Sequence, residues 1–388
     1  MKQCMKQYKI GIAGTRGKST LLGFRGIANA AVTAVCDLDE HTLNAFGDAA
    51  GVPPKGRFRV FEDMLETDID AVVIATPMQC HVPQALAAML AGKHVLCEVP
   101  AAVTMDELWW LIETKEKTGR TFMMAENYCY TPAVQLVKAL RDAGAFGTPF
   151  YAEGEYLHEL GDHYLLRPDG GPSWRKFWQM GRRGNFYPTH SLGPVMEWFA
   201  GDRVAEISCF GTGGGLVSPE YRQDELTVTM CRMAGGALAK ITTACIAPRP
   251  HNMHAYLLQG TKGCYEAPRG LGDDHKVWLA GHPAPGDPEG EKRWRSLWDF
   301  REEYLPQRWK NPPEEAKNAG LQGGDYYLVQ DFMDAMENGV EPMANVYRAA
   351  EWTAVGLLSE LSCVNGGRAM EVPHFRKNMP NGERIVKL

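Results

Sequence analysis

The sequence predicts an α/β protein with two domains, a doubly wound parallel sheet followed by an α+β domain whose sheet is mostly antiparallel. The first observation is that short apolar runs alternate with helical segments up to about residue 127, which is typical of parallel sheets. The second is the change after this point to alternating strands at hairpin spacing. The third is the length of 388 residues, which is enough for two hydrophobic cores. We therefore expect domains at 1–127 and 128–388.

The composition is that of an ordinary globular protein and excludes several functional classes. Hydrophobic residues make up 45% of the chain and charged residues 23%, and the net charge of −6 argues against a nucleic-acid partner. We interpret the basic and aromatic segment 292–298 as a structural or pocket-covering loop. No apolar run reaches the roughly 20 residues that span a bilayer. Residues 1–7 lack the apolar core of a secretion signal, so we expect no membrane partner.

The cysteines indicate a reducing compartment. Ten cysteines are scattered singly along the chain, and none belongs to a CxxC pair. Cys36, Cys97, Cys231 and Cys245 fall inside predicted strands, where a free cysteine behaves as a small buried apolar residue. The sequence therefore predicts a cytoplasmic protein.

The stretch 70–102 organises the first domain and predicts where a ligand binds. Apolar runs before and after a helical segment at 81–91 are typical of two buried parallel strands with a crossover. Thr76 and Pro77 end the first of these strands, and Glu98 follows the second. Ligands of open α/β sheets bind beyond the carboxyl ends of the strands. Both turns therefore face one expected pocket, and Glu98 is the carboxylate that these two strands place there.

A glycine-containing turn joins the first predicted strand, at 8–13, to a helix at 19–29. Such a turn cradles phosphate because backbone N–H groups and the helix dipole converge there. Read from Gly14 as the dinucleotide fingerprint GxGxxG, the turn has Arg16 at the second glycine and Ser19 at the third. The residues of the turn are Gly14, Thr15, Arg16 and Gly17.

Two other interpretations of this turn compete with dinucleotide binding. A Walker loop that ends at residues 17–19 requires a glycine at position 12, where this chain has Ile12. The shorter string Gly-Thr-x-Gly-Lys-Ser at 14–19 resembles the nucleotide loop of ATP-dependent amide ligases. This stretch alone leaves the choice open.

The second predicted strand, at 31–36, favours a dinucleotide. It ends at Asp37, about 20 residues past the glycine turn, where dinucleotide-binding folds place a carboxylate on the ribose hydroxyls. An acidic side chain at this position disfavours a 2′-phosphate, so NAD is expected rather than NADP. The alternative is that Asp37 or Asp39 only caps the following helix.

Capping and turn residues predict the other elements of the first domain. Thr104 to Glu107 forms a capping box, and Gly119 closes the helix that it starts. Thr131 and Pro132 begin another helix, with proline in its first turn. Further strands are expected at 58–61 and 121–125, and Glu126 and Asn127 follow the second of them.

The second domain is predicted from alternating strands. Expected strands lie at 150–157, 207–210, 226–233, 237–243, 254–259 and 263–266. Helices are expected at 190–199, 326–337 and 346–361. The irregular segments 161–183 and 268–325 are long enough that we expect them to cover a site or wrap a partner subunit.

Several motifs of residues 8 to about 160 resemble the nucleotide half of the Gfo/Idh/MocA oxidoreductases. They are the strand at 70–77, His81, the string Gly-Lys-His-Val-Leu-Cys-Glu-x-Pro at 92–100, and Glu126-Asn127. The resemblance implies an NAD(P)-binding Rossmann domain followed by an antiparallel α/β domain, and it removes the amide-ligase interpretation. Ordinary dehydrogenases of this family have a lysine where this chain has Val99. They also have an aspartate four residues before His190, where this chain has Phe186.

These departures are similar to those of glycoside hydrolase family 109. The motifs that carry the similarity lie at 98–102, 152–160, 174–175 and 184–194. The resemblance implies an NAD-dependent glycosidase that acts on N-acetylgalactosaminides. It also implies a redox-assisted elimination, in which NAD⁺ takes hydride from the sugar C3 and a base removes the acidified C2 proton. The C1 substituent then leaves, water adds, and the hydride returns.

The resemblance also implies which residues carry the chemistry. His190 suits general-base work near neutral pH, and Tyr187 lies three residues before it, so both can face one pocket. Tyr156 and His158 share one face of a strand, and Glu98 is expected to orient substrate or cofactor. The expected cofactor-binding residues are Gly14, Thr15, Arg16, Gly17, Asp37, Thr76, Pro77, His81, Glu98, Asn127, Trp174 and Arg175.

Two other functions stay open at this point. One is an NAD(P)-dependent sugar or cyclitol dehydrogenase with an altered proton relay, and the other is a nucleotide-binding protein without turnover. No metal site is expected, because His158 and His163 are five residues apart and cannot share a helix face as zinc requires. The expected partner is a small-molecule carbohydrate. An exposed face of the antiparallel sheet favours a homodimer or homotetramer.

Overall fold

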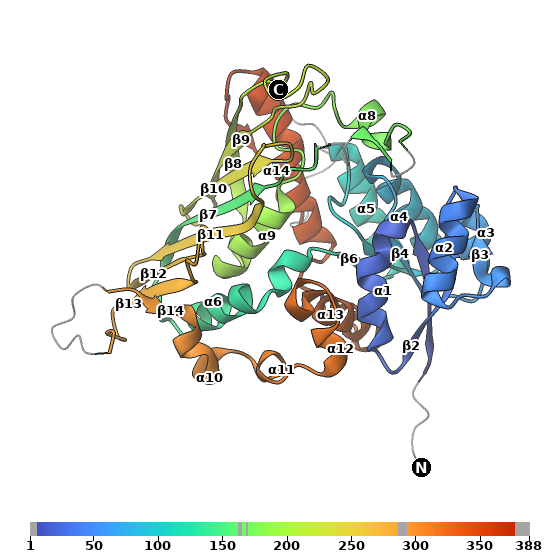
Figure 1. The fold of residues 1–388 in the computed structure, drawn as a ribbon, viewed down its shortest axis with the longest axis horizontal. Coiled ribbons are helices and arrows are strands. Elements are labelled where there is room, and N and C mark those ends of the chain that lie inside the picture. Colours follow the sequence, from blue (N-terminus) through green and yellow to red (C-terminus); the bar gives the residue numbers. More distant parts are fainter. Residues whose placement is uncertain (1–5, 162–164, 168–169, 286–292, 377–388) are drawn as a thin grey trace, which may run out of the picture. The chain divides into compact units, whose positions relative to one another are not determined.

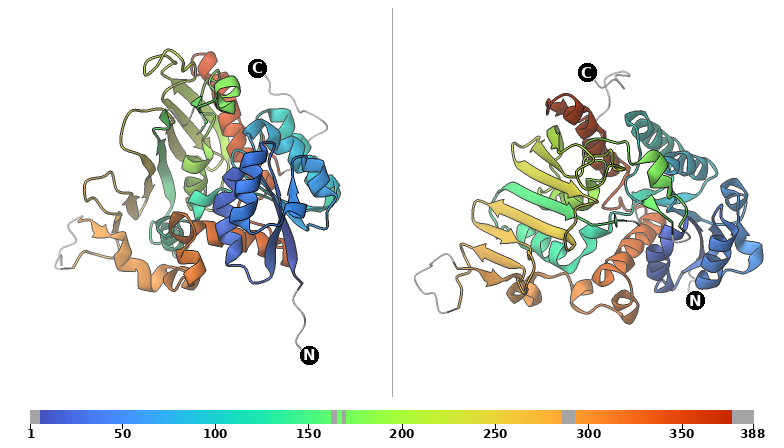
Figure 2. Two further views of the ribbon diagram at one scale, coloured as in Figure 1. Left: turned by 45° about the vertical axis from the view of Figure 1, so that its right-hand side comes forward. Right: turned by 45° about the horizontal axis from the view of Figure 1, so that its top comes forward.

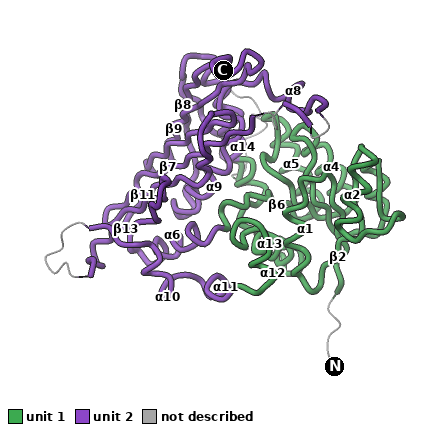
Figure 3. The backbone as a smooth tube through the Cα atoms, in the orientation of Figure 1, with its two compact units in different colours: residues 1–130, 312–350, 375–388 green, residues 131–311, 351–374 purple. Residues whose placement is uncertain are grey.

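The computed structural model describes residues 6–161, 165–167, 170–285 and 293–376. The chain forms two compact units (Figure 3). Unit 1 comprises residues 1–130, 312–350 and 375–388, and unit 2 comprises residues 131–311 and 351–374. The predicted division after residue 127 lies close to the first of these boundaries. The helix at 324–338, predicted to belong to the second domain, instead packs in unit 1.

The described residues of unit 1 form a six-stranded parallel sheet with the order β3-β2-β1-β4-β5-β6. This is the strand order of a dinucleotide-binding doubly wound fold, and the predicted fold class of this half is confirmed. The strands are β1 (Tyr8–Ala13), β2 (Ala30–Cys36), β3 (Arg57–Phe58), β4 (Ala71–Ile74), β5 (His94–Cys97) and β6 (Phe122–Met124). All four residues of β4 are buried, as expected for a strand that is covered on both faces.

Helices of unit 1 begin and end at the signals in the sequence. Thr104 and Glu107 form the predicted capping box, and Gly119 ends the helix with a φ of 65°. The helices are α1 (Lys18–Arg25), α2 (Glu40–Ala50), α3 (Phe61–Leu65), α4 (His81–Leu90), α5 (Met105–Thr118), α12 (Glu314–Lys317) and α13 (Gly324–Asn338), with short 3-10 turns between them (Figure 1). The predicted strand at 58–61 is wrong beyond Phe58. Phe61 opens α3, where Glu62 and Asp63 in the first turn favour a helix start.

Helix α13 joins unit 1 through a close contact with α1. A Cβ on Gly23 of α1 would lie 2.6 Å from the carbonyl oxygen of Asp325 and 2.8 Å from a methyl group of Val329. Glycine at position 23 therefore lets the two helices approach closely. The apolar periodicity of α13 predicts a buried face but does not say which unit buries it, so the sequence could not place this helix.

The described residues of unit 2 form a nine-stranded sheet with the order β14-β13-β12-β11-β7-β10-β9-β8-β15. Its pairings are antiparallel except for the parallel pair β7–β10, so the predicted mostly antiparallel sheet is confirmed. Figure 2 shows β7 between its neighbours β10 and β11. The strands are β7 (Pro149–Leu157), β8 (Val204–Gly211), β9 (Thr227–Met233), β10 (Leu238–Ala244), β11 (Asn252–Gly260), β12 (Gly263–Glu266), β13 (Lys276–Leu279), β14 (Arg295–Ser296) and β15 (Met370–Glu371).

The segment 268–325 is more regular than predicted. It contains β13, β14 and the short helices α10 (Arg301–Tyr304) and α11 (Gln307–Lys310), with Val277, Leu297 and Phe300 buried. Elements of two to four residues are too short to show a hydrophobic periodicity, so they could not be predicted from the sequence. The other helices among the described residues of unit 2 are α6 (Pro132–Asp142), α8 (Trp174–Trp178) and α9 (Thr189–Trp198), with α14 (Val346–Val364) extending from residues of unit 1.

Candidate active site

The glycine turn of unit 1 is shaped by Gly14, which follows β1. Gly14 has a φ of 87°, and its N–H donates to the carbonyl of Cys36 at the end of β2 (2.9 Å). A Cβ on Gly14 would lie 2.4 Å from the carbonyl oxygen of Ala75, at the end of β4. No residue other than glycine fits this conformation and this close approach without a shift of the backbone. The turn therefore holds its N–H groups at the carboxyl ends of three neighbouring strands.

The position of Gly17 shows that the GxGxxG fingerprint aligns with this chain differently from the alignment predicted from the sequence. A Cβ on Gly17 would lie 2.4 Å from Cγ2 of Ile12 in β1, so this glycine permits the close helix–strand packing assigned to the third glycine of the motif. Gly14 then stands at the second glycine, and Ile12 occupies the first. The interpretation that placed Arg16 and Ser19 at glycine positions is wrong. Arg16 is instead an exposed residue just before the start of α1.

Gly17→Ala is expected to weaken both the fold and cofactor binding. The new methyl group overpacks against Ile12, so we expect a loss of about 1–3 kcal/mol in the free energy of unfolding. The dissociation constant for NADH should rise at least tenfold, as measured by quenching or enhancement of nicotinamide fluorescence. In an Ile12→Ala background, which removes Cγ2, the same substitution should cost less than about 0.5 kcal/mol. Equal costs in both backgrounds would rule out this packing role.

Asp37 lies at the end of β2, and the residue that caps the following helix is its neighbour Asp39. Asp39 is the N-cap of α2, where its carboxylate accepts from the N–H of Thr42 (2.8 Å). Asp37 accepts from the N–H of Asp39 (3.0 Å) and from the backbone of Thr15. Burial raises the pKa of Asp37 above its ordinary value, and these backbone donors partly oppose the rise. Asp39 is thus the helix cap, and Asp37 lies at the end of β2, where the sequence predicts a contact with the ribose hydroxyls.

The features of the turn fit a dinucleotide. The first turn of α1 contains no acidic residue that would repel phosphate, and α1 is eight residues long. The backbone at Gly14 lacks the Cβ that would obstruct a pyrophosphate. These observations support binding of NAD by unit 1.

His81 holds together the two loops that follow β4 and β5. It is buried, and its ring nitrogens lie 2.8 Å from the carbonyl oxygen of Pro100 and 2.9 Å from that of Thr76. The Thr76 hydroxyl donates to the side chain of Gln84 (2.6 Å). Both ring nitrogens of His81 therefore face protein backbone, and its contact with the cofactor stays a prediction. Pro77 lies in the first of these loops.

Glu98 and Asn127 lie at the carboxyl ends of neighbouring strands. Glu98 directly follows β5, is partly buried, and its N–H donates to the carbonyl of Ile74 (2.8 Å). Asn127 lies just after β6, and its amide nitrogen donates to the carboxylate of Asp325 (2.9 Å). Asp325 is buried at the start of α13. The sequence did not suggest Asp325, because nearly 200 residues separate it from Asn127.

Unit 2 brings together the four other residues predicted to be catalytic. The hydroxyl oxygen of Tyr187 lies 3.2 Å from Nε2 of His190, and their rings meet edge to face with centroids 5.0 Å apart. The ring of Tyr156 lies 5.3 Å from that of His190, 5.6 Å from that of Tyr187 and 5.5 Å from that of His158. His190 is 7% exposed and Tyr156 is also 7% exposed. We call these four residues, Tyr156, His158, Tyr187 and His190, the imidazole–phenol cluster.

Gly154 places helix α9 against the strand that carries half of this cluster. A Cβ on Gly154 would lie 2.3 Å from the carbonyl oxygen of Ser191 in α9. Residues 154, 156 and 158 share one side of the strand because side chains alternate. Tyr256, opposite Gly154 on β11, donates its hydroxyl to the carbonyl of His190 (2.7 Å). Because position 154 is a glycine and Tyr256 binds the carbonyl of His190, the distance of His190 from the sheet is fixed.

Two further histidines, His254 and His251, lie near the imidazole–phenol cluster and were not predicted from the sequence. His254 lies on β11 two residues before Tyr256, within a register shift of the strand, and is close enough to His190 for the two imidazoles to interact electrostatically. Burial, the largest cause, and the neighbouring His190 and His275 together lower the pKa of His254 to about 4. His254 is therefore neutral at physiological pH. The ring of His251 lies 4.4 Å from that of His158. The signal in the sequence was the alternation of His254 with Tyr256 in a predicted strand.

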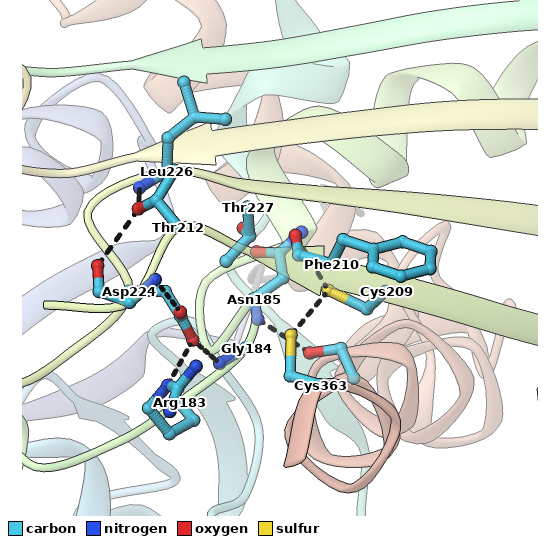
Figure 4. A network of polar contacts seen from close by, with 12 residues as sticks. Arg183, Gly184, Asn185, Cys209, Phe210, Thr212, Asp224, Leu226, Thr227 and Cys363 are labelled. Atoms are coloured by element: carbon cyan, nitrogen blue, oxygen red, sulfur yellow. Dashed lines mark hydrogen bonds and ion pairs between the residues drawn. The ribbon is translucent and has the colours of Figure 1, made fainter. Parts of the chain in front are cut away.

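Asp224, which was also not predicted from the sequence, anchors the segment that leads to Tyr187. Its carboxylate is fully buried and accepts from Nε of Arg183 (2.9 Å), the N–H of Gly184 (2.6 Å) and the N–H of Gly213 (2.7 Å). Figure 4 shows the bonds from Arg183 and Gly184 converging on the carboxylate. The N–H of Asn185 donates to the hydroxyl of Ser359 in α14 (2.7 Å). Residues 183–185 are thus fixed from two sides just before the cluster.

Asp224→Asn is expected to destabilise unit 2 and to lower turnover. An amide in this position loses the ion pair and turns a donor toward groups that themselves donate, so we expect a cost of about 2 kcal/mol at pH 7 by urea unfolding. Burial raises the pKa of Asp224, but Arg183 and the backbone donors outweigh it, and the net pKa is lowered. The stabilising contribution is therefore complete above the unfolded pKa of about 3.9 and disappears as the pH falls through the folded pKa. Glu314→Gln, which breaks an exposed ion pair with Lys317, is the control and should cost less than about 0.5 kcal/mol.

Trp174 and Arg175 begin helix α8, and the guanidinium of Arg175 lies 4.4 Å from the centre of the Trp174 ring. The Ser173 hydroxyl accepts from the N–H of Arg175 and caps the helix. A cavity of about 500 Å³ is lined by residues of 176–181 and 219–222. Neither it nor the Trp174–Arg175 pair contains a residue of the imidazole–phenol cluster.

Other expectations from the sequence concern metals, membranes and cysteines. Within the described residues no group of three or more His, Cys, Asp or Glu side chains is arranged to hold a metal ion, and His163 lies outside that part of the chain. No described helix is long and apolar enough to cross a membrane. Cys36, Cys97, Cys231 and Cys245 are buried free thiols, as predicted. In the segment 292–298, Leu297 is buried, and Lys292 lies outside the described residues.

Comparison with known proteins identifies both halves of the chain. Residues 8–126 match the oxidoreductase family with an NAD-binding Rossmann fold, and residues 135–380 match the C-terminal domain of glycosyl hydrolase 109. A glycosyl hydrolase family 109 protein of Solibacter usitatus (strain Ellin6076) is 32% identical over 402 residues, which cover 95% of this chain and 88% of that protein. An alpha-N-acetylgalactosaminidase of Tannerella forsythia is 30% identical over 94% of this chain and 85% of that protein.

A solved structure shows the same fold. A levoglucosan dehydrogenase in complex with NADH is 20% identical and has a TM-score of 0.78, over 95% of this chain and all of that one. The predicted resemblance is thereby confirmed at the level of family and fold. The chain belongs to glycosyl hydrolase family 109 and carries an NAD-binding Rossmann domain of the oxidoreductase family at its N-terminal end.

Proposed function

We propose that this protein is an NAD-dependent glycosidase that acts on an N-acetylhexosaminide by transient oxidation at the sugar C3. The observation that carries the proposal is the imidazole–phenol cluster of unit 2, in which the Tyr187 hydroxyl lies 3.2 Å from Nε2 of His190. A lysine and an aspartate serve the proton relay of dehydrogenases that this chain resembles, and it has Val99 and Phe186 at those positions. The relative from Tannerella forsythia, named an alpha-N-acetylgalactosaminidase, supports the substrate class.

Residues of unit 1 would hold the cofactor. The N–H groups of the turn at Gly14 to Gly17 and the N-terminus of α1 suit the pyrophosphate, and Asp37 suits the ribose hydroxyls of NAD better than the 2′-phosphate of NADP. Glu98 and Asn127 follow neighbouring strands at the ligand-binding edge of the sheet, and Asp325 orients the amide of Asn127. When bound, NAD supplies a hydride acceptor that returns the hydride at the end of the cycle.

The cluster in unit 2 would move the protons. The Tyr187–His190 pair can accept a proton from the sugar C3 hydroxyl through the phenol oxygen, with the imidazole as the adjoining base. Tyr156 and His158 would serve the other two proton transfers, from the acidified C2 and to the leaving oxygen at C1. Burial and the nearby His251 lower the pKa of His158, so its imidazole is neutral near pH 7 and available as a base.

The test is incubation of the purified protein with NAD⁺ and a panel of aryl N-acetylhexosaminides of both anomers. Release of the aryl alcohol without net accumulation of NADH supports the glycosidase. Steady NADH formation from free sugars or cyclitols would instead establish the dehydrogenase, which the likeness to levoglucosan dehydrogenase keeps as the second candidate. Bound cofactor with no turnover on either panel would establish the nucleotide-binding protein without activity.

We also propose a homodimer or homotetramer that forms through the outer face of the sheet in unit 2. Phe210, Met230 and Leu238 lie on this face, with exposed fractions of 64%, 37% and 41%. On the same face, Glu153 pairs with Lys240 and Glu155 with Arg269. Light scattering coupled to size exclusion tests this, and a monomer at micromolar concentration would contradict it. The proposed compartment is the cytoplasm, consistent with the buried free thiols.

A further inference from the structure

The loop that precedes α13 in unit 1 has an unusual backbone. Leu321 and Gln322 have φ angles of 50° and 57°, and Gly323 follows with a φ of 96°. Three successive residues are therefore left-handed, and two of them carry a Cβ, which approaches the backbone too closely in this conformation. Such residues cost free energy and gather at functional sites, where the surrounding structure holds them in place. We call residues 320–323 the left-handed loop.

Neighbouring groups of unit 1 hold the left-handed loop in place. The N–H groups of Gly323 and Asp325 both donate to the carbonyl of Gly320, at 3.1 and 3.4 Å. A Cβ on Gly320 would lie 2.2 Å from Oδ2 of Asp325, so the loop closes tightly on this buried carboxylate. Oδ1 of the same carboxylate accepts from the amide of Asn127 (2.9 Å). The loop is thus fixed to the segment that follows β6.

This position lies at the ligand-binding edge of the sheet. Asn127–Tyr130 forms a 3-10 turn just past the carboxyl end of β6, and ligands of open α/β sheets bind at that edge. A Cβ on Gly324 would lie 3.1 Å from the carbonyl oxygen of Tyr130, so the end of the loop packs directly on this turn. In a doubly wound fold, β1 to β3 belong to the half that binds the adenosine nucleotide and β4 to β6 to the half that binds the second nucleotide. The left-handed loop therefore borders the half that suits the nicotinamide nucleotide.

The glycine turn also lies close to this segment. Burial is the largest influence on the Tyr128 phenol and raises its pKa, and Glu126 and Asp325 raise the pKa further. Arg16 of the glycine turn lowers the same pKa. Charges influence a titrating group mainly over short distances, so Arg16 and Asp325 both lie near Tyr128. The left-handed loop and the glycine turn thus border the same edge of unit 1.

The two left-handed side chains have different surroundings. Leu321 is half-buried, and its Cβ lies 3.3 Å from the point that a Cβ on Gly324 would occupy, so packing explains this residue. Gln322 is exposed, and its amide makes no hydrogen bond with the described residues. The described part of unit 1 therefore does not explain why a glutamine stands where the backbone suits glycine. A ligand at this edge would explain it.

We propose that Gln322 is a cofactor-binding residue whose side-chain amide contacts the nicotinamide nucleoside of NAD. This inference rests on the proposed function, in which unit 1 binds NAD. An amide suits this ligand, because ribose hydroxyls and the nicotinamide carboxamide each donate and accept hydrogen bonds. The left-handed backbone fixes the direction of the Gln322 side chain before the cofactor arrives, which reduces the entropy lost on binding.

The first test is titration of the whole protein with NADH, followed by nicotinamide fluorescence. Gln322→Ala removes the amide and keeps the Cβ, whereas Gln322→Gly removes both. Each substitution should raise the dissociation constant for NADH roughly fivefold, as expected for the loss of one hydrogen-bonding group. ADP keeps the adenosine and the pyrophosphate but lacks the nicotinamide nucleoside. Its dissociation constant, measured by isothermal titration calorimetry, should therefore stay within about twofold of wild type in both variants.

The second test separates a lost contact from damage to the fold. Gln322→Gly relieves a left-handed residue, so its melting temperature without cofactor should equal or exceed that of wild type. Leu271→Gly is the matched control, because Leu271 is also exposed and left-handed, with a φ of 48°, and lies in unit 2. This control should show the same thermal behaviour and leave the dissociation constant for NADH unchanged.

Three results would overturn the inference. They are wild-type affinity for NADH in Gln322→Ala, an equal loss of affinity for NADH and ADP, and a lower melting temperature in Gln322→Gly. Glycoside turnover enters none of these measurements. If wild type binds NADH but releases no aryl alcohol, the proposed glycosidase fails, and the titrations still decide the role of Gln322. A wild type that binds no NADH would overturn both proposals.

Discussion

His190→Ala is expected to lower kcat for aryl glycoside turnover by about 10³-fold while NADH binding stays within twofold of wild type. General acid–base groups contribute about 10²–10⁴ in rate, and this imidazole is the base that adjoins the Tyr187 phenol. The Tyr256 hydroxyl binds the backbone carbonyl of His190, not its ring, so the truncation leaves helix α9 in place. Stopped-flow or steady-state release of the aryl alcohol measures the effect.

Tyr187→Phe and the double variant show whether the pair acts as a unit. The single phenol deletion should cost about 10²-fold, and adding it to His190→Ala should cost little more, since residues that act together are strongly non-additive. His282→Ala, in the same unit and outside the cluster, is the control and should leave kcat unchanged. Activity retained in His190→Ala with an intact fold would remove this residue from the mechanism.

Gly154→Ala adds a single methyl group. It is expected to move the half of the cluster at α9 away from the half on the strand β7. The added Cβ would lie 2.3 Å from the carbonyl oxygen and 2.9 Å from the carbonyl carbon of Ser191, and backbone atoms cannot rotate away as a side-chain end would. Helix α9 must therefore move off β7, and His190 moves with it. We expect a loss of about 1–3 kcal/mol in the free energy of unfolding. A misplacement of about 1 Å at a catalytic group costs on the order of 10²-fold in kcat.

The matched control for this substitution is Gly281→Ala. Gly281 also lies in unit 2, its φ is not positive, and a Cβ built on it meets nothing within 4 Å. Gly281→Ala should leave the unfolding free energy within about 0.5 kcal/mol of wild type. If Gly154→Ala folded with wild-type stability and turnover, the close approach of α9 to β7 would not determine the geometry of the cluster.

Local signals predicted most of the regular structure. The capping box at Thr104, the proline at the start of α6 and the apolar runs of β1, β4 and β5 each depend on neighbours a few residues away. The pairs Tyr156–His158 and Tyr187–His190 were also readable, because a period of two in strands and a spacing of three at a helix start place side chains together. Their contacts across the two elements confirm that the four residues meet.

The errors arose where a residue's role depends on a distant partner. The alignment of the glycine motif depends on two close approaches, that of Gly17 to Ile12 and that of Gly14 to Ala75. Both approaches join separate elements. Asp224 is more than 30 residues from the segment that it anchors, and Asp325 is nearly 200 residues from Asn127. Such pairings leave no period or spacing in the sequence.

By itself, the sequence determined the fold class, the family resemblance and the chemical identity of the cluster, because these depend on residue types at short spacing. The tertiary structure alone decided that α13 packs in unit 1, that Gly154 brings α9 onto β7, and that His251 and His254 lie beside the predicted histidines. The physical reason is that close packing joins surfaces from remote parts of the chain. Whether two such surfaces fit depends on the shapes of both, and the sequence of one segment does not show the shape of the other.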